Sequence, residues 1–185
     1  TRQEAAFWAG CDGAALDGLL KRAVGAGEVW RYRRGLYGLS PRFSRVKVDP
    51  FALAQYLHGP SYLSLEAALA HHGWIPEAVY TVTCATCERS RSFETPLGFF
   101  VYKRIPQNKF FAGVRQETAA DGGVFFVASP LKALADYIYV HRPAWEGPES
   151  ARASLRIDDA DWAVLDGEMV HELEGVYRDA RVLRF

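Results

Sequence analysis

The chain has 185 residues, of which 49% are hydrophobic and 14% aromatic, a composition that supports a packed core and excludes broad disorder. No apolar run approaches the roughly 20 residues of a membrane-spanning helix, and no signal peptide is visible. We therefore expect a cytoplasmic protein with no membrane partner. The three cysteines are an odd number and do not suggest a disulfide framework.

The net charge of zero conceals an uneven distribution along the chain. Residues 1–50 contain nine basic and five acidic side chains, a net charge of +4, whereas residues 144–185 contain five and ten, a net charge of −5. From Leu19 to Val48 there are eight basic residues and the single acid Glu28. This concentration of positive charge predicts a polyanion-binding surface in the first fifty residues.

Two helices are predicted at the start of the chain. Thr1-Arg2-Gln3-Glu4 fits a capping box, so a helix should begin there and end at Gly10. A second helix is expected over residues 14–24, because hydrophobic side chains recur there at helical spacing. This predicted buried stripe consists of Leu16, Leu19, Leu20 and Ala23.

Residues 28–40 read as a short basic β-hairpin. Strand-forming Val29, Trp30 and Tyr32 lead into a turn at Arg33-Arg34-Gly35, and Gly35 supplies the backbone freedom of a tight turn. We expect Arg31, Arg33 and Arg34 to project from the tip, where guanidinium groups suit DNA phosphates. The alternative is an edge hairpin whose arginines only keep it soluble.

Helix, short turn, helix and hairpin is the order of a winged helix-turn-helix, here without the usual leading helix. We predict this partial DNA-binding domain over residues 1–48. The second helix lacks Asn and Gln on its exposed face and carries Asp17, which would repel phosphate, so it should discriminate little between sequences. If that helix is purely structural, the module is a docking scaffold. The predicted DNA-binding residues are Lys21, Arg22, Arg31, Arg33, Arg34, Arg42 and Lys47.

Residues 49–185 are predicted to form a second domain of mixed α+β structure. Helices are expected over 51–57 and 64–72, and strands over 79–87, 98–105 and 123–128, with a weaker strand candidate over 110–114. Val124 to Val127 is apolar on both faces, so this strand should lie centrally with cover on each side. Beyond it, helical spacing returns in the acidic tail, where Asp158 or Asp159 is the expected cap.

Ser129 and Pro130 suit the cap and first position of a further helix. On that helix Lys132 and Asp136 lie four residues apart on a shared side. Such a pair stabilises a helix by roughly 0.2 to 0.5 kcal/mol.

The sequence shows no clear chemistry of catalysis or metal binding. Cys84 and Cys87 have the CxxC spacing of zinc ribbons and redox sites, but no second CxxC or histidine pair completes four ligands. His71 and His72 would point about 100° apart on a helix and could not readily share a metal. No nucleotide-phosphate loop, nucleophile elbow or dinucleotide motif is present. We therefore predict no enzyme, no cofactor and no metal.

The chain resembles the AbiEi antitoxins of type IV toxin-antitoxin systems. The most specific matches are the Ser-Leu-Glu-Ala-Ala-Leu helix leading to His72 and Gly73, and the run from Ala128 to Asp136. In family order, the matching stretches are RYRRGLYGLSP, SYLSLEAALAHHGWIPE, VYTVTCATCERSRSFETPLGFFVYKRI and VFFVASPLKALADYIY. Together they cover most of residues 28–140.

This resemblance implies a bacterial antitoxin and transcriptional autoregulator of a phage-defence system. Its winged helix-turn-helix would bind double-stranded DNA of its own operon promoter. Its C-terminal domain would counteract a nucleotidyltransferase-like toxin, without necessarily forming a stable complex. The resemblance also makes Lys132 and Asp136 candidates for fixing a surface needed for antitoxicity. The alternative function is a protein-interaction module whose winged fold does not bind DNA, and an enzyme is a minor third hypothesis.

Overall fold

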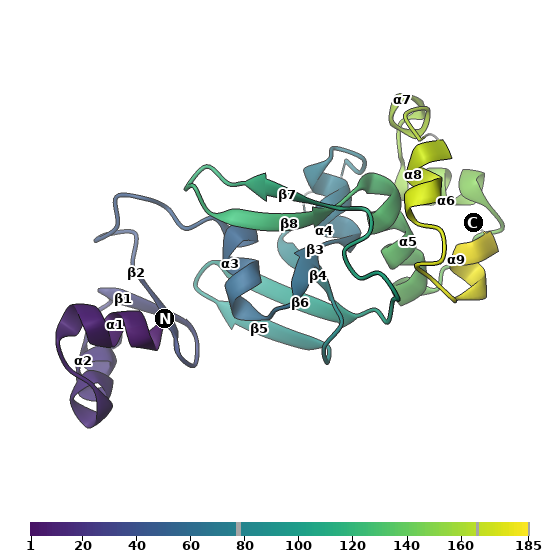
Figure 1. Cartoon of the computed structure of the whole chain (residues 1–185). Helices are drawn as coiled ribbons and strands as arrows, with labels where there is room; N and C mark the ends of the chain where they lie inside the picture. The colour runs from purple at the N-terminus through teal and green to yellow at the C-terminus, as the bar shows by residue number, and fades with distance from the viewer. Residues whose placement is uncertain (77–78, 166, 185) are drawn as a thin grey trace.

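The computed structural model describes residues 1–76, 79–165 and 167–184, which fold as a mixed α+β protein (Figure 1). The α+β class expected from the sequence is confirmed. We call residues 1–48 the N-terminal unit and residues 49–184 the body. Figure 1 shows the N-terminal unit at one end of the molecule and the last helices at the other. In the described ranges, no helix combines the length and the apolar character that crossing a membrane requires.

The N-terminal unit has the predicted order of two helices and a hairpin. Its elements are α1 (Arg2–Ala9), α2 (Gly13–Gly25), β1 (Val29–Arg33) and β2 (Leu36–Leu39). The Thr1 hydroxyl accepts the Glu4 amide at 3.4 Å, so the predicted capping box is present. Leu16 and Leu20 are buried, but Leu19 is 40% exposed, so the hydrophobic stripe of α2 is narrower than predicted.

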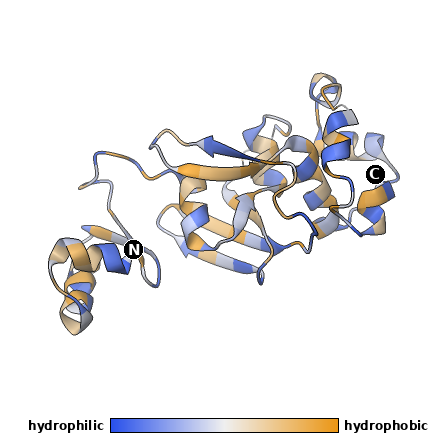
Figure 2. Ribbon diagram, in the orientation of Figure 1, coloured by the Kyte–Doolittle hydropathy of each residue, from blue (hydrophilic) through white to orange (hydrophobic). Residues whose placement is uncertain are grey.

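The body is built on one six-stranded sheet in the order β5-β6-β4-β3-β8-β7. Its strands are β3 (Ser61–Leu63), β4 (Thr81–Thr86), β5 (Arg91–Thr95), β6 (Gly98–Arg104), β7 (Val114–Thr118) and β8 (Val124–Ala128). The β4–β6 and β3–β8 pairs are parallel and the other pairs are antiparallel. Figure 2 shows hydrophobic residues along β8 and hydrophilic ones along the neighbouring edge strand β7.

Two helices pack against this sheet. The Tyr102 hydroxyl on β6 donates to the Ala54 carbonyl of α3 (Pro50–Leu57) at 2.7 Å. Thr83 on β4 accepts an amide of α4 (Leu65–His71) at 3.0 Å. Tyr102 is paired with Cys84, the neighbour of Thr83. Because successive strand residues point to opposite faces, Tyr102 and Thr83 reach these helices from the two sides of the sheet. At the far end of α4, His71 contacts Phe51 of α3 and Phe125 of β8.

The sequence prediction of the strands needs three corrections. The weaker candidate over 110–114 is wrong, because the chain turns there and β7 begins only at Val114. Neither β3 nor β5 was predicted. Finally, β8 is flanked by β3 and β7, but its two faces are not equally covered. Phe125 and Val127 are buried, whereas Val124 is 40% exposed.

The remaining helices follow the sheet. They are α5 (Pro130–His141), α6 (Pro148–Leu155), α7 (Asp159–Trp162), α8 (Gly167–Glu172) and α9 (Ala180–Arg184). The predicted caps are present, because the Ser129 side chain accepts the Lys132 amide at the start of α5 and Asp158 accepts an amide of α7. One residue of the quoted family stretches, Glu77, lies outside the described residues.

Candidate functional site

The seven residues predicted to bind DNA all lie in the N-terminal unit and are all solvent-exposed. Arg31, Arg33 and Arg34 come from the hairpin, Lys21 and Arg22 from α2, and Arg42 and Lys47 from the connector after β2. Arg42 lies 5.5 Å from the centre of the Phe43 ring. The structure therefore gathers these cations in one small unit, where they are accessible to a ligand.

The hairpin is shaped by two glycines and one buried tyrosine. Gly35 has φ +80°, a left-handed conformation that a residue with a Cβ rarely adopts, and this closes the turn. Gly38 lies under Tyr32, and a Cβ there would come within 2.8 Å of the Tyr32 ring. Tyr32 is 4% exposed. The hairpin thus packs its aromatic face inward and leaves the arginines outside.

Arg33 differs from the other hairpin arginines. Its Nε and Nη2 atoms donate to the Tyr56 carbonyl at the end of α3, at 3.2 and 2.9 Å. Its Nη1 donates to the Arg34 carbonyl at 3.0 Å. The prediction that all three arginines project freely from the tip is therefore wrong for Arg33, whose guanidinium is held by the body.

The acid on α2 also has a partner that the sequence did not reveal. Arg2 of α1 donates to the Asp17 carboxylate at 2.9 Å. This ion pair offsets part of the negative charge that would face a phosphate. Asp17 remains 66% exposed, so the local repulsion is reduced rather than removed.

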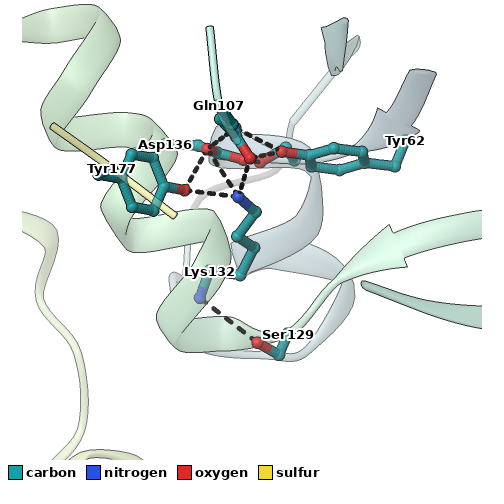
Figure 3. A network of polar contacts seen from close by, with 7 residues as sticks. Tyr62, Gln107, Ser129, Lys132, Asp136 and Tyr177 are labelled. Atoms are coloured by element: carbon teal, nitrogen blue, oxygen red, sulfur yellow. Dashed lines mark hydrogen bonds and ion pairs between the residues drawn. The ribbon is translucent and has the colours of Figure 1, made fainter. Parts of the chain in front are cut away.

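A second candidate site lies inside the body, around Lys132 and Asp136. Both side chains have 0% exposure, and the ammonium nitrogen lies 3.6 Å from the carboxylate. The predicted pairing is confirmed, but the environment differs from that of a surface helix pair. Four further side chains complete a buried cluster, seen in part in Figure 3. Of these, Tyr62, Ser64 and Tyr177 are buried, and Gln107 is partly exposed.

Asp136 is the acceptor at the centre of this buried cluster. Its Oδ2 accepts from the Tyr62 hydroxyl at 2.9 Å and from the Ser64 hydroxyl at 2.7 Å. Its Oδ1 accepts from the Gln107 amide at 3.0 Å and also from the Tyr177 hydroxyl. Four donors from outside the helix therefore satisfy the carboxylate, which is the condition for burying such a group.

Lys132 is fully engaged as well. Its ammonium donates to the Tyr177 hydroxyl at 2.8 Å and to the Gln107 side-chain carbonyl. It also lies 4.5 Å from the centre of the Tyr177 ring, within cation–π range. An ammonium has three donors, and Asp136, Gln107 and Tyr177 together surround it.

Burial dominates the proton affinities of the cluster. It lowers the pKa of Lys132, and the Asp136 charge opposes that shift. Burial also raises the pKa of Tyr62 and Tyr177 well above the ordinary value of 10.0, with the Asp136 charge adding to the rise. The two tyrosines therefore keep their protons as donors to the carboxylate far into alkaline pH.

The cluster joins segments that are distant in the sequence. Tyr62 comes from β3, Gln107 from the loop after β6, and Tyr177 from the segment between α8 and α9. Their separations from Asp136 are 74, 29 and 41 residues. Sequence reasoning found Lys132 and Asp136 from their four-residue spacing, but no local signal marked their partners. The arrangement ties the C-terminal segment to the sheet and leaves no unpaired reactive group within it.

The CxxC cysteines and the adjacent pair of histidines lie outside the N-terminal unit and outside the buried cluster. Cys84 is buried on β4 and Cys87 is exposed beyond its end. Burial raises the pKa of the Cys84 thiol, which disfavours the thiolate that metal and redox chemistry need. The His72 Nε2 lies 2.8 Å from the Ala128 carbonyl, and the His71 Nε2 lies 2.9 Å from Glu117. Across the described ranges, no three His, Cys, Asp or Glu side chains are placed to share a metal ion.

Neither a scan against protein-family models nor a search of curated proteins gives a match to this chain.

Proposed function

We propose that this protein is a DNA-binding autoregulator and antitoxin, in which the N-terminal unit binds promoter DNA and the body counteracts a nucleotidyltransferase-like toxin. The observation that carries this proposal is the order helix, helix and arginine hairpin, with the cationic side chains of α2 and the hairpin exposed together. This order and this placement of charge support the proposal because they are typical of a winged helix-turn-helix.

The proposed DNA contacts are mainly to phosphates. Arg31 and Arg34 on the hairpin, with Lys21 and Arg22 on α2, provide charge without the amide side chains that read adenine. Arg42 and Lys47 extend the positive surface along the connector. We therefore propose strong dependence on salt and modest discrimination between sequences.

A binding assay on the full chain with its own promoter tests this proposal. If about five side chains meet phosphates, the logarithm of the affinity should fall against that of the salt concentration with a slope of about −4.5. The double variant Arg31→Ala/Arg34→Ala should reduce the magnitude of the slope by about two. The matched control Arg91→Ala/Arg115→Ala removes the same charge from exposed positions on β5 and β7 and should leave the slope unchanged. Equal slopes in both double variants would remove the hairpin from the interface.

The antitoxin activity is proposed for the body, with the buried cluster as its support. Because Lys132 and Asp136 are inaccessible, we propose that they act by holding the C-terminal segment in place and not by touching a partner. Asp136→Ala and the isosteric Asp136→Asn should both lose toxin rescue in cells, with the fold checked by circular dichroism. Full rescue by a variant with a native spectrum would show that Asp136 is not needed for antitoxin activity.

One observation favours a second candidate, a protein-interaction module that does not bind DNA. Phe7 and Trp8 on α1 are 78% and 83% exposed and pack edge to face on each other. Exposed aromatic side chains are common in protein interfaces. Absence of promoter binding at low salt would favour this alternative.

A further inference from the structure

Arg33 closes the end of a helix that belongs to the body. The last turn of α3 contains no basic residue of its own. Carbonyl groups in the last turn of a helix lack intrahelical donors and carry partial negative charge. Arg33 supplies both a cation and two N–H donors to the Tyr56 carbonyl in that turn. This cap comes from a different part of the chain, and so it links the two regions.

The surroundings of this contact show a built junction. The Tyr102 hydroxyl donates to the Ala54 carbonyl, two residues before Tyr56 in α3. Burial raises the pKa of Tyr102, and the charge of Arg33 opposes that rise. Tyr32 and Leu36 of the hairpin are buried in the same hydrophobic core as the strands of the body. Two carbonyls of α3 are thus satisfied from two different strands.

The hairpin is irregular in front of Arg33. The register of β1 and β2 shifts between Arg31 and Arg33. Such an irregularity breaks the strict alternation of a strand and redirects a side chain. The rule that residues two apart on a strand share a face therefore does not apply to Arg31 and Arg33. Arg34, the next residue, makes no side-chain hydrogen bond or ion pair to any residue of the described ranges.

Arg33 also supplies the hydrogen bonds that connect the N-terminal unit to the body. Among residues 1–76, 79–165 and 167–184, the hydrogen bonds between the N-terminal unit and the body are those from Arg33 to Tyr56. The connector is fixed at its far end, where the Asp49 amide donates to Asp121 at 2.8 Å. Between these two points, rotation of the N-terminal unit is restrained by the Arg33 contact and by the apolar packing of Tyr32 and Leu36.

We propose that Arg33 is a positioning residue that clasps the hairpin to α3 and orients the N-terminal unit, so that the phosphate contacts of the hairpin come from Arg31 and Arg34 alone. The part of this inference that concerns phosphate contacts rests on the proposed DNA-binding function, whereas the contact between Arg33 and α3 does not. Three of the five donor hydrogens of the guanidinium already point to protein carbonyls, which leaves Arg33 poorly placed to hold a phosphate.

Native cysteines allow a direct measurement of the clasp in the full chain. Cys11 is partly exposed in the turn between α1 and α2, Cys87 is exposed on the body, and Cys84 is buried. Spin labels on Cys11 and Cys87 report the distance between the two regions. Arg33→Ala should broaden the distance distribution, and Arg34→Ala, the matched control, should leave it unchanged. Arg33→Lys should resemble Arg33→Ala, because an ammonium lacks the fork that holds one carbonyl with two donors.

Promoter binding provides the second measurement. Arg33→Ala should weaken binding about threefold to tenfold at every salt concentration, because orientation is lost, with the salt slope unchanged. Arg34→Ala should instead reduce the magnitude of the slope by about one. A slope reduced by Arg33→Ala together with an unchanged distance distribution would overturn the inference.

If the native chain binds no promoter DNA, the proposed function fails, and the distance measurement alone tests the contact between Arg33 and α3. An unchanged distribution in Arg33→Ala would then disprove it.

Discussion

The N-terminal unit and the body both carry the charged side chains that the sequence singles out, but they hold them in opposite ways. In the body, Lys132 and Asp136 have no exposure, and protein groups occupy their donors and acceptors. In the N-terminal unit, Arg31 and Arg34 point into solvent. A charge removed from the body leaves its partner buried and unpaired, whereas one removed from the surface leaves its neighbours in water. Charged side chains therefore stabilise the fold in the body and remain available for a ligand in the N-terminal unit.

The largest expected effect comes from Asp136→Ala. This substitution removes the acceptor of four hydrogen bonds and leaves the Lys132 ammonium buried without its counter-charge. Breaking a buried pair in this way costs about 3 to 5 kcal/mol. We expect the free energy of unfolding, measured by urea denaturation, to fall by that amount.

Lys132→Met is the companion measurement for this prediction. It removes the other charge but leaves the carboxylate with its four donors, so the loss should be smaller than for Asp136→Ala. Equal losses would show that the charge pair, and not the set of hydrogen bonds to Asp136, dominates the cluster.

The next effect concerns alkaline pH. The pKa values of Tyr62 and Tyr177 are raised by burial in the folded state, while in the unfolded chain these groups ionise near 10.0. Above that pH the folded state binds more protons than the unfolded state, so stability falls as pH rises. The contribution of each such tyrosine to this slope grows above pH 10 and approaches about 1.4 kcal/mol per pH unit.

Tyr177→Phe should make this decline less steep by one such contribution. The readout is the slope of unfolding free energy between pH 10 and 11, which separates the titration from the constant cost of a lost hydrogen bond. Tyr80→Phe is the matched control, because Tyr80 is 89% exposed. A Tyr177→Phe slope equal to that of the native chain would place this hydroxyl in solvent.

An intermediate effect is expected where the two regions meet. Asp49 accepts the Phe51 and Ala52 amides at 2.8 and 3.2 Å and so caps α3. Asp49→Ala should cost about 1 kcal/mol of unfolding free energy. Asp49→Ser should recover most of that loss, because a hydroxyl caps nearly as well. Failure of Asp49→Ser to recover stability would assign the effect to something other than the cap.

The sequence predicted well those features that depend on neighbouring residues. Each of these features is determined by residues only a few positions apart. Examples are the capping box at Thr1, the hairpin turn at Gly35 and the Ser129 cap before Pro130. The α5 ion pair is equally local, since its members are one turn apart. Local chemistry is sufficient for such features because the alternatives are few.

Features that depend on distant partners were missed. Strand β3 has only three residues, and it exists because it pairs with β4 and β8. The contact from Arg33 to Tyr56 spans 23 residues, and the hydrogen bond from Tyr62 to Asp136 spans 74. No periodicity within a segment encodes such pairings, because they arise when the sheet brings the segments together. The burial of Lys132 and Asp136 could not be predicted for the same reason.

The smallest expected effect on stability comes from Asp17 in the N-terminal unit. Asp17 is 66% exposed and pairs with Arg2, so Asp17→Ala should change the free energy of unfolding by no more than about 0.5 kcal/mol. The same substitution should strengthen promoter binding. Removing an acid from α2 and freeing Arg2 should raise the affinity by up to about fivefold, since two charges in contact in water interact by about 1 kcal/mol. The gain should disappear at high salt, where exposed charges are screened. Unchanged affinity at low salt would mean that this end of α2 faces away from the DNA, and the contact surface would then reduce to the hairpin and the connector.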